Sequence, residues 1–345
     1  MGGQLPDLPP VFRLAEARAL GLSVHAVRGA VQRGALRRVG HGLYAVGRVS
    51  VQDGERWAIV RDDHLRRCRE QLARHPGHAA SHLTAAVVHG MALTLHPRAA
   101  VHLTCIDNEP RSRRENGAVL HHSDSVENET VVVDGIRVTT PGRTCADVMR
   151  TMRKPNSVAL VDQALRSGLV TEHEVRRALG MQRRWRGRPR AREAMDLVDP
   201  RRESWLESYS FVTLHEIGLP VPLPQVDVLD GDLNFVGRVD GLLDGVFLEA
   251  DGQDKYFLDS VSGRLSPEQS AVRRIASERG RHDALEALGL VGVRWTTDEI
   301  RNRPGVVAAR VQAGLRRADP TAFTGWIRWE GRLHQTAFVA DLLAG

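Results

Sequence analysis

The chain is poor in lysine, in cysteine and in long apolar runs. Only two lysines, Lys154 and Lys255, stand among the 48 basic residues, so arginine carries almost all of the positive charge. The three cysteines are far apart and odd in number, which argues against a disulfide framework or a zinc site and favours reduced thiols. No apolar run reaches the roughly 18 residues of a transmembrane helix.

The N-terminus lacks a charged segment followed by an apolar one, so we expect no signal peptide, a cytoplasmic location and no membrane partner. A length of 345 residues with 42% hydrophobic residues fits two or three folded domains. The net charge of +6 permits nucleic-acid binding without requiring it.

Two carboxylates are predicted to face each other on a hairpin in the C-terminal part. Asp244-Gly245 lies between two apolar runs and is typical of a two-residue turn. In that register Asp240 faces Glu249, and Arg238 faces Asp251 on the same side of the hairpin. The other side is expected to face the core and carries Val239, Leu243, Val246, Leu248 and Ala250. Opposed carboxylates repel each other. Because hard divalent cations such as Mg²⁺ prefer oxygen ligands, the pattern favours a metal site.

The same residues carry a resemblance. An Asp, a short gap and then Glu-x-Lys on neighbouring strands is the signature of PD-(D/E)XK nucleases. The run from Arg238-Val-Asp240 through Glu249-Ala-Asp-Gly252 to Lys255 resembles the very-short-patch-repair-endonuclease-like domain, over roughly residues 203–300. The expected order of helix, three strands, helix and strand agrees with that core. The resemblance therefore implies an α/β/α restriction-endonuclease-like fold.

The resemblance also implies roles for single residues. Asp240 and Glu249 would hold Mg²⁺ (or Mn²⁺), and Glu207 matches an additional acid on the first helix. The metal would lower the pKa of a bound water and offset charge on the phosphate. Lys255 would stabilise that charge or orient the nucleophile. Three arginines of the following helix could contact the DNA backbone: Arg273, Arg274 and Arg281.

The sequence departs from the general motif at one position. Asp251 stands two residues after Glu249, where the motif has lysine. Lys255 could take the place of that lysine, or Asp251 could bind a second metal ion or lock Arg238. A further alternative is an inactive nuclease fold kept as a DNA-binding or scaffold domain.

Residues 9–50 predict a compact winged helix. Ser23 is a good N-cap for a helix whose valines follow at helical spacing, and Gly34 ends that helix. A first helix is expected from Val11 to about Leu20. Residues 35–46 then predict two short strands around His41-Gly42.

The basic residues of this segment favour DNA binding. Arg28 and Arg33 lie on the second helix opposite its valines, and Arg37 and Arg38 lie at the base of the wing. A helix in the major groove with a basic wing on phosphate is how such a module binds DNA. A winged helix used for protein contact is the alternative.

This segment resembles the N-terminal winged helix of AbiEi-type (type IV) antitoxins, on Gly21–Arg28, Arg33–Val39 and Gly42–Ala45. That resemblance implies DNA and a cognate toxin as partners. A winged helix on palindromic DNA would also predict a homodimer.

The middle region, residues 51–200, predicts an α+β domain and resembles the non-catalytic middle domain of AbiEi-like proteins. Its histidines match no known ligand spacing, so we expect surface or hydrogen-bonded side chains rather than a metal site. Six of them are His82, His89, His96, His102, His121 and His122. The basic run 183–192 could track phosphates or be a solvated surface.

The sequence thus predicts an α/β multidomain protein divided at residues 1–50, 51–200, 201–315 and a C-terminal extension, 316–345. The sequence leaves two functions open. One is a metal-dependent DNA endonuclease targeted by the winged helix, in phage defence or DNA repair. The other is a non-catalytic antitoxin-type regulator with a degenerate nuclease fold. A protein-interaction scaffold explains the architecture but not the opposed acids.

Overall fold

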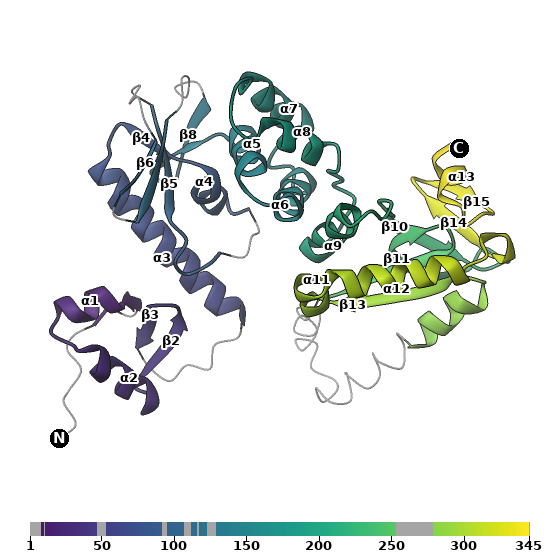
Figure 1. Cartoon of the computed structure of the whole chain (residues 1–345), viewed down its shortest axis with the longest axis horizontal. Helices are drawn as coiled ribbons and strands as arrows, with labels where there is room; N and C mark the ends of the chain where they lie inside the picture. The colour runs from purple at the N-terminus through teal and green to yellow at the C-terminus, as the bar shows by residue number, and fades with distance from the viewer. Residues whose placement is uncertain are drawn as a thin grey trace. The chain divides into compact units, whose positions relative to one another are not determined.

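The computed structural model describes residues 8–9, 11–46, 53–91, 95–106, 112–115, 117–122, 129–252 and 279–344. They group into two compact units (Figure 1). Unit 1 holds residues 1–151 and 172–183, and unit 2 holds residues 152–171 and 184–345. The four-part division expected from the sequence stays a prediction. Among the described residues, no helix is both long and apolar enough to cross a membrane.

Unit 1 begins with a small sheet and two helices. The strands are ordered β1-β3-β2 and all pair antiparallel. The elements are β1 (Val11–Arg13), α1 (Leu14–Ala19), α2 (Val24–Gln32), β2 (Leu36–Gly40) and β3 (Leu43–Val46). Two expectations are confirmed: Ser23 caps α2 by accepting a bond from the Ala26 N–H, and the wing turns at His41-Gly42. The helix expected from Val11 begins only at Leu14, because residues 11–13 pair with β3.

A small apolar core holds these elements together. Phe12 and Val27 are fully buried, and the Phe12 ring stacks on Tyr44 at a centroid distance of 5.9 Å. The valines of the second helix were expected to lie on one side, opposite Arg28 and Arg33. This is wrong at Val24, which is exposed. Val24 is the first residue of α2, one turn before the part of the helix that covers the sheet.

A buried carboxylate connects the small sheet to the long helix α3 (Asp53–Arg74). Asp63 accepts bonds from Arg13 of β1 and from Arg66 and Arg67 of its own helix. Burial alone would raise the pKa of Asp63, but these three guanidinium groups hold it below the ordinary value. The winged segment is therefore fixed to the middle part by a compensated buried charge.

The larger sheet of unit 1 has the strand order β6-β7-β5-β4-β9-β8. Its strands and its remaining helices are β4 (His78–Ala80), α4 (His82–Val88), β5 (Val101–Cys105), β6 (Arg113–Glu115), β7 (Ala118–His121), β8 (Thr130–Val133), β9 (Ile136–Thr139), α5 (Pro141–Thr151) and α7 (Glu172–Met181). β5 pairs parallel with β7, and β4 pairs parallel with β9. The helix, strands and strand-to-helix turn expected at residues 81–147 are confirmed.

Unit 2 contains a second six-stranded sheet, ordered β13-β12-β11-β10-β14-β15. Strands β10, β11 and β12 pair antiparallel, and β13 is parallel to β12. Residues 279–287, just before β13, are helical. The other elements are α6 (Lys154–Arg166), α8 (Arg188–Met195), α9 (Trp205–Glu216), β10 (Leu223–Leu229), β11 (Phe235–Leu243), β12 (Val246–Asp251), β13 (Val291–Thr296), α11 (Thr297–Asn302), α12 (Pro304–Arg317), η3 (Pro320–Ala322), β14 (Trp326–Trp329), β15 (Arg332–His334) and α13 (Val339–Ala344).

The hairpin turn has the conformation that the sequence predicts. Asp244 and Gly245 both have positive φ, 32° and 78°, and Leu243 pairs with Val246. The C-terminal segment holds this turn, since the Gly245 N–H donates to the Ala337 carbonyl at 3.0 Å. β14 also pairs with β10, so residues after 316 complete the sheet of unit 2.

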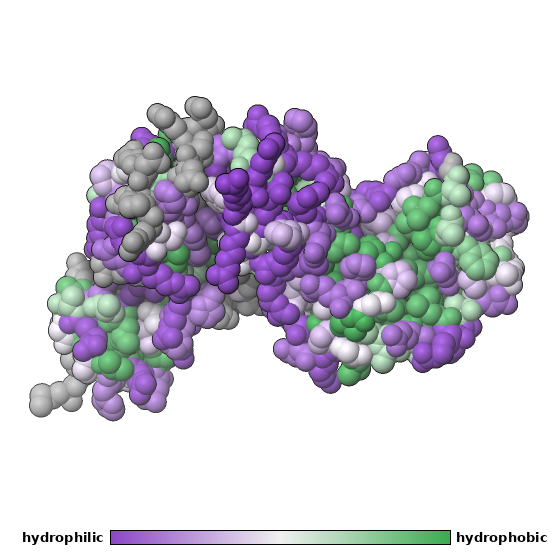
Figure 2. All heavy atoms as spheres, turned by 45° about the horizontal axis from the view of Figure 1, so that its top comes forward, coloured by the Kyte–Doolittle hydropathy of each residue, from purple (hydrophilic) through white to green (hydrophobic). Residues whose placement is uncertain are grey.

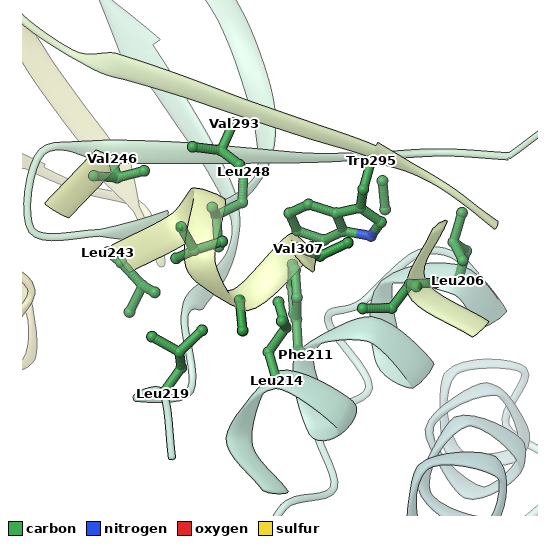
Figure 3. Packing of buried hydrophobic residues seen from close by; sticks show 14 of the residues in the cluster. Leu206, Phe211, Leu214, Leu219, Leu243, Val246, Leu248, Val293, Trp295 and Val307 are labelled. Carbon is green, nitrogen blue, oxygen red and sulfur yellow. The ribbon is translucent and has the colours of Figure 1, made fainter. Parts of the chain in front are cut away.

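Apolar side chains cover both faces of this sheet. One cluster joins side chains of the sheet to those of α9, α11 and α12. It includes the residues labelled in Figure 3, which are Leu206, Phe211, Leu214, Leu219, Leu243, Val246, Leu248, Val293, Trp295 and Val307. The second cluster contains Val239, Leu242 and Phe247. The single core face expected for the hairpin is therefore wrong at Val239, because β11 buries residues on both sides of the sheet.

The surface keeps some apolar side chains exposed. The face drawn in Figure 2 is largely hydrophilic, and its larger hydrophobic areas lie on the C-terminal part. Exposed apolar residues of unit 2 include Phe235, Leu333 and Leu343. Apolar atoms make up much of any folded surface, so these residues alone indicate no function.

Replacing Gly241 by alanine should destabilise unit 2. A Cβ at this position would lie 2.7 Å from Phe211 Cζ, inside the core. Forcing a methyl group into a packed core costs about 1–3 kcal/mol. Gly231→Ala is the matched control, because the nearest atom to a Cβ there, the Thr324 carbonyl oxygen, is 3.9 Å away. Urea unfolding, followed by tryptophan fluorescence, should give Gly241→Ala a lower free energy of unfolding than Gly231→Ala. Equal free energies of unfolding would contradict the close contact between Gly241 and Phe211.

Candidate functional site

The exposed face of α2 gathers polar and basic side chains. His25, Arg28 and Gln32 follow at helical spacing on the face opposite the buried Val27 and Ala30, and all three are exposed. The sequence predicted Arg28 but missed His25 and Gln32. The spacing of three and four residues from Arg28 was the signal that could have found them.

Arg33 and the wing extend this basic surface. The exposed Arg33 folds back over α2, because a Cβ at Gly29 would lie 3.1 Å from Arg33 Nη1. On β2, Arg37 is half-buried and Arg38 is exposed. Arg38 Nη2 lies 3.4 Å from Nδ1 of His41, at the tip of the wing. The four arginines of the N-terminal segment that are predicted to bind DNA therefore lie on α2, at its C-cap and on the adjoining strand β2.

Glu249, the second predicted metal ligand, is held by two arginines. It is buried on β12, and its Oε1 lies 2.6 Å from Arg281 Nη2. Its Oε2 accepts a bond from Arg294, which lies directly opposite Glu249 in the parallel pairing of β12 and β13. Both carboxylate oxygens thus have a guanidinium partner.

The fold makes room for one of these arginines. A Cβ at Gly237 would lie 2.9 Å from Arg281 Cδ, so the arginine side chain passes directly over a glycine of β11. Arg281 Nη1 also donates to the Arg238 carbonyl at 3.0 Å. Arg281 thereby joins the carboxylate to the strand beside it, and its expected contact with DNA stays a prediction.

Asp240 ends the ladder between β11 and β12. The pairing runs from Leu243 and Val246 to Gly241 and Leu248. The Oδ2 of Asp240 then accepts the Ala250 N–H at 2.8 Å. The carboxylate thereby binds a main-chain donor of the neighbouring strand, immediately after Glu249.

Glu207 supports the start of α9. Ser204 caps this helix, and Glu207 Oε2 accepts bonds from the Glu203 N–H and from Gln225 Nε2, both at 2.8 Å. Gln225 lies on β10, so the buried Glu207 joins the helix to the sheet. This carboxylate is engaged by donors of its own chain.

Arg238 donates to Asp227 of the adjacent strand β10, with Nε to Oδ1 at 2.6 Å. Asp227 also accepts from Arg328 of β14 at 2.9 Å, and the two arginines lower its pKa although burial opposes them. Asp251, the residue predicted to face Arg238, lies half-buried at the end of β12. Lys255, Arg273 and Arg274 lie outside the described residues.

These contacts test the fit of Mg²⁺. Within the described ranges, no three carboxylates bring ligand oxygens within 4.8 Å of one another. Glu249 is bound by two guanidinium groups, and Asp240 and Glu207 accept N–H donors. Glu249 is the carboxylate with a guanidinium group on each oxygen, so a cation could bind there only by displacing Arg281 or Arg294.

Three histidines of unit 1 form a cluster that the sequence did not predict. One ligand nitrogen from each of His82, His102 and His121 lies within 4.8 Å of the others. His102 Nδ1 and His121 Nε2 are 2.9 Å apart, so the expected hydrogen bonding is confirmed for this pair. Burial, as the largest cause, lowers the pKa of His102 and of His121 to about 4. The alternation of β5 and β7, which puts both residues on one face, was the missed signal.

Two comparisons with known proteins bear on these observations. Residues 5–47 match the family model of the AbiEi antitoxin transcriptional regulators. The chain is also 29% identical over 289 residues to Uncharacterized protein MT2308 and to Uncharacterized protein Rv2248, from two strains of Mycobacterium tuberculosis. The matched region covers 84% of this chain and 95% of each relative. The N-terminal segment therefore resembles an antitoxin-type regulator domain, as the sequence predicts.

Replacing Glu249 by glutamine should destabilise unit 2. The change leaves Arg281 and Arg294 without their shared carboxylate, which should cost about 1–3 kcal/mol. Glu286→Gln is the matched control, since Glu286 is an exposed acid in the same unit. Denaturant unfolding without metal measures both. If other carboxylates surrounded Glu249 instead, the glutamine would relieve their repulsion and raise the free energy of unfolding. That result would contradict the pairing of Glu249 with the two arginines.

Proposed function

We propose that this protein is a DNA-binding regulator of the AbiEi antitoxin type. The observation that carries the proposal is the exposed face of α2, with its adjoining basic wing, in the segment that matches the family model. A short helix with basic and amide side chains opposite a buried face suits the major groove.

The side chains of this face suit distinct tasks. Arginine pairs with guanine or with phosphate, and glutamine pairs with adenine, so Arg28 and Gln32 are the residues proposed to contact bases. Arg33, Arg37 and Arg38 are proposed to contact phosphates, which fixes the register of the protein on the duplex. A cytoplasmic location follows from the proposed contact with DNA.

The resemblance also supports two further partners as proposals. A cognate toxin is the partner that an antitoxin-type regulator requires. A homodimer would match a palindromic site, because half-sites on DNA mirror the twofold symmetry of the protein.

Unit 2 supports a nuclease-like fold that serves without catalysis. Three antiparallel strands after α9, followed by a strand parallel to the third, favour the restriction-endonuclease-like architecture. The arginine pairs of Glu249 count against phosphodiester cleavage at this site. A metal-dependent endonuclease is the second candidate function, favoured by the placement of Asp240 beside the residue that follows Glu249.

Removing the arginines of α2 should weaken DNA binding. Arg28→Ala and Arg33→Ala should each reduce affinity about 5- to 100-fold, because each removes a contact to a base or a phosphate. Fluorescence anisotropy measures this on a duplex selected from a random pool by the wild-type protein. A lost phosphate contact should also reduce the slope of log K against log salt by about 1.

Arg18→Ala is the control for this experiment, since Arg18 is an exposed arginine of α1 in the same small fold. Gln32→Ala should relax the base preference at one position while leaving the salt slope unchanged. Equal losses in Arg18→Ala and Arg28→Ala would show general charge attraction and refute α2 as the recognition helix.

A plasmid assay tests the second candidate function. We expect no nicking of supercoiled plasmid or cutting of single-stranded DNA with Mg²⁺ or Mn²⁺, because arginines occupy both oxygens of Glu249. Wild type is compared with Asp240→Ala and Glu249→Ala. Metal-dependent nicking that disappears in both variants would establish the endonuclease and overturn the non-catalytic proposal.

A further inference from the structure

Three separate elements of unit 1 bring histidines to one place. His82 is the first residue of α4, His102 lies on β5, and His121 lies on β7. The His82 and His121 rings stack at a centroid distance of 3.8 Å, and those of His102 and His121 lie 5.2 Å apart. Nitrogens from all three fall within 4.8 Å of one another.

The sheet positions two of these side chains. In the parallel pairing of β5 and β7, His102 lies opposite Val119 and Thr104 lies opposite His121. Residues two apart on a strand point to the same face, so His102 and His121 lie on one face of neighbouring strands. Both residues are half-buried, so each keeps some contact with solvent.

The third side chain is held in an unusual backbone conformation. His82 has a positive φ of 51°, which is uncommon for a residue with a Cβ and costs free energy. The chain enters this position from Ser81, whose N–H donates to the His102 carbonyl at 2.9 Å. Ser81 Oγ also lies 3.0 Å from His82 Nδ1. The residue before the strained one is thus bound directly to the strand that carries His102.

A buried carboxylate stands behind the cluster. Asp147 Oδ2 lies 4.0 Å from His82 Nδ1, and Asp147 is fully buried on α5. Arg143 Nε, Arg150 Nη2 and Gln182 Nε2 donate to it at 2.9, 2.6 and 3.0 Å. At 4.0 Å this carboxylate is too far from the His82 ring for a hydrogen bond, and Ser81 Oγ is the group within hydrogen-bond distance of Nδ1. A polar group bound to the second ring nitrogen helps to orient a metal-binding imidazole.

We propose that His82, His102 and His121 bind one divalent transition-metal ion of the zinc class through three imidazole nitrogens. Imidazole is a preferred ligand of Zn²⁺, and three histidines with an open fourth position form a known type of zinc site. Tetrahedral ligands at Zn–N distances of about 2.0–2.1 Å lie about 3.3 Å apart. The nitrogens lie within 4.8 Å of one another, so metal binding requires the rings to turn from their stacked arrangement until the three nitrogens point at one ion.

The fourth position determines what the site can do. The half-buried His102 and His121 leave it open to a water molecule or to an anionic side chain of a partner. The proposal is independent of DNA binding by α2, because it uses none of the residues assigned to that face.

Zinc binding is measured on the full chain, without a histidine tag and after treatment with a chelator. Competition with a chromophoric chelator gives the affinity for Zn²⁺, and Co²⁺ as a spectroscopic substitute reports the ligand set. His82→Asn is the most informative variant, because asparagine tolerates positive φ and so preserves the backbone while removing the imidazole. His102→Gln is the second variant. His173→Ala, an exposed histidine of α7 in the same unit, is the matched control.

We expect wild type and His173→Ala to bind one equivalent of Zn²⁺ and to melt a few degrees higher with it. His82→Asn should fold normally and bind at least about 100-fold more weakly, since even residues behind a ligand are worth 10- to 100-fold. A wild-type protein that takes up no Zn²⁺, or binding that survives in both variants, would overturn the site and leave a hydrogen-bonded histidine trio. If His102→Gln fails to fold, two other measurements show whether the histidines bind the ion. They are the visible spectrum of the wild-type protein with Co²⁺ and the Zn²⁺ affinity of His82→Asn.

Discussion

The fold depends on arginines that neutralise carboxylates inside it. An isolated buried carboxylate costs many kcal/mol, and only a partner that also satisfies its lone pairs offsets that cost. Asp63 fixes the winged segment in this way, Asp147 binds two arginines of α5, and Glu249 joins β12 to β13 and to Arg281. Arginine suits this task, because its planar fork donates several bonds at once and stays charged. A chain with only two lysines has little other means of compensating such groups.

This constraint decides how the predicted metal site is interpreted. An acid on a strand can be neutralised by a cation or by a guanidinium group, and the short motif around Asp240 and Glu249 is the same in both cases. Arg281 and Arg294, which neutralise Glu249 in place of a cation, come much later in the chain. Arg294 lies opposite Glu249 because β13 is parallel to β12 in one particular register. No local pattern specifies that register, so the sequence could predict the acids but not their partners.

The features that the sequence predicted correctly are governed by neighbouring residues. The Asp244-Gly245 turn needs positive φ at two consecutive positions, and Ser23 needs only a donor three residues ahead. Apart from local misses on α2, the failures concern distant contacts. Val239 packs on the second face of a sheet that is covered on both sides, and β14 joins that sheet beside β10. Likewise, the histidine cluster forms only where α4, β5 and β7 meet.

The two groups of candidate ligands also differ in what they can bind. The carboxylates of unit 2 carry charge and suit hard cations such as Mg²⁺, but arginines and N–H donors of the same chain already use them. The histidines of unit 1 are neutral donors, which suit softer ions such as Zn²⁺ and repel neighbouring arginines less than protonated rings would. Nitrogen ligands do not require a compensating cation when no metal is bound, whereas clustered carboxylates do. A chain this rich in arginine can therefore keep an imidazole site available for a metal, while its buried carboxylates are drawn into ion pairs.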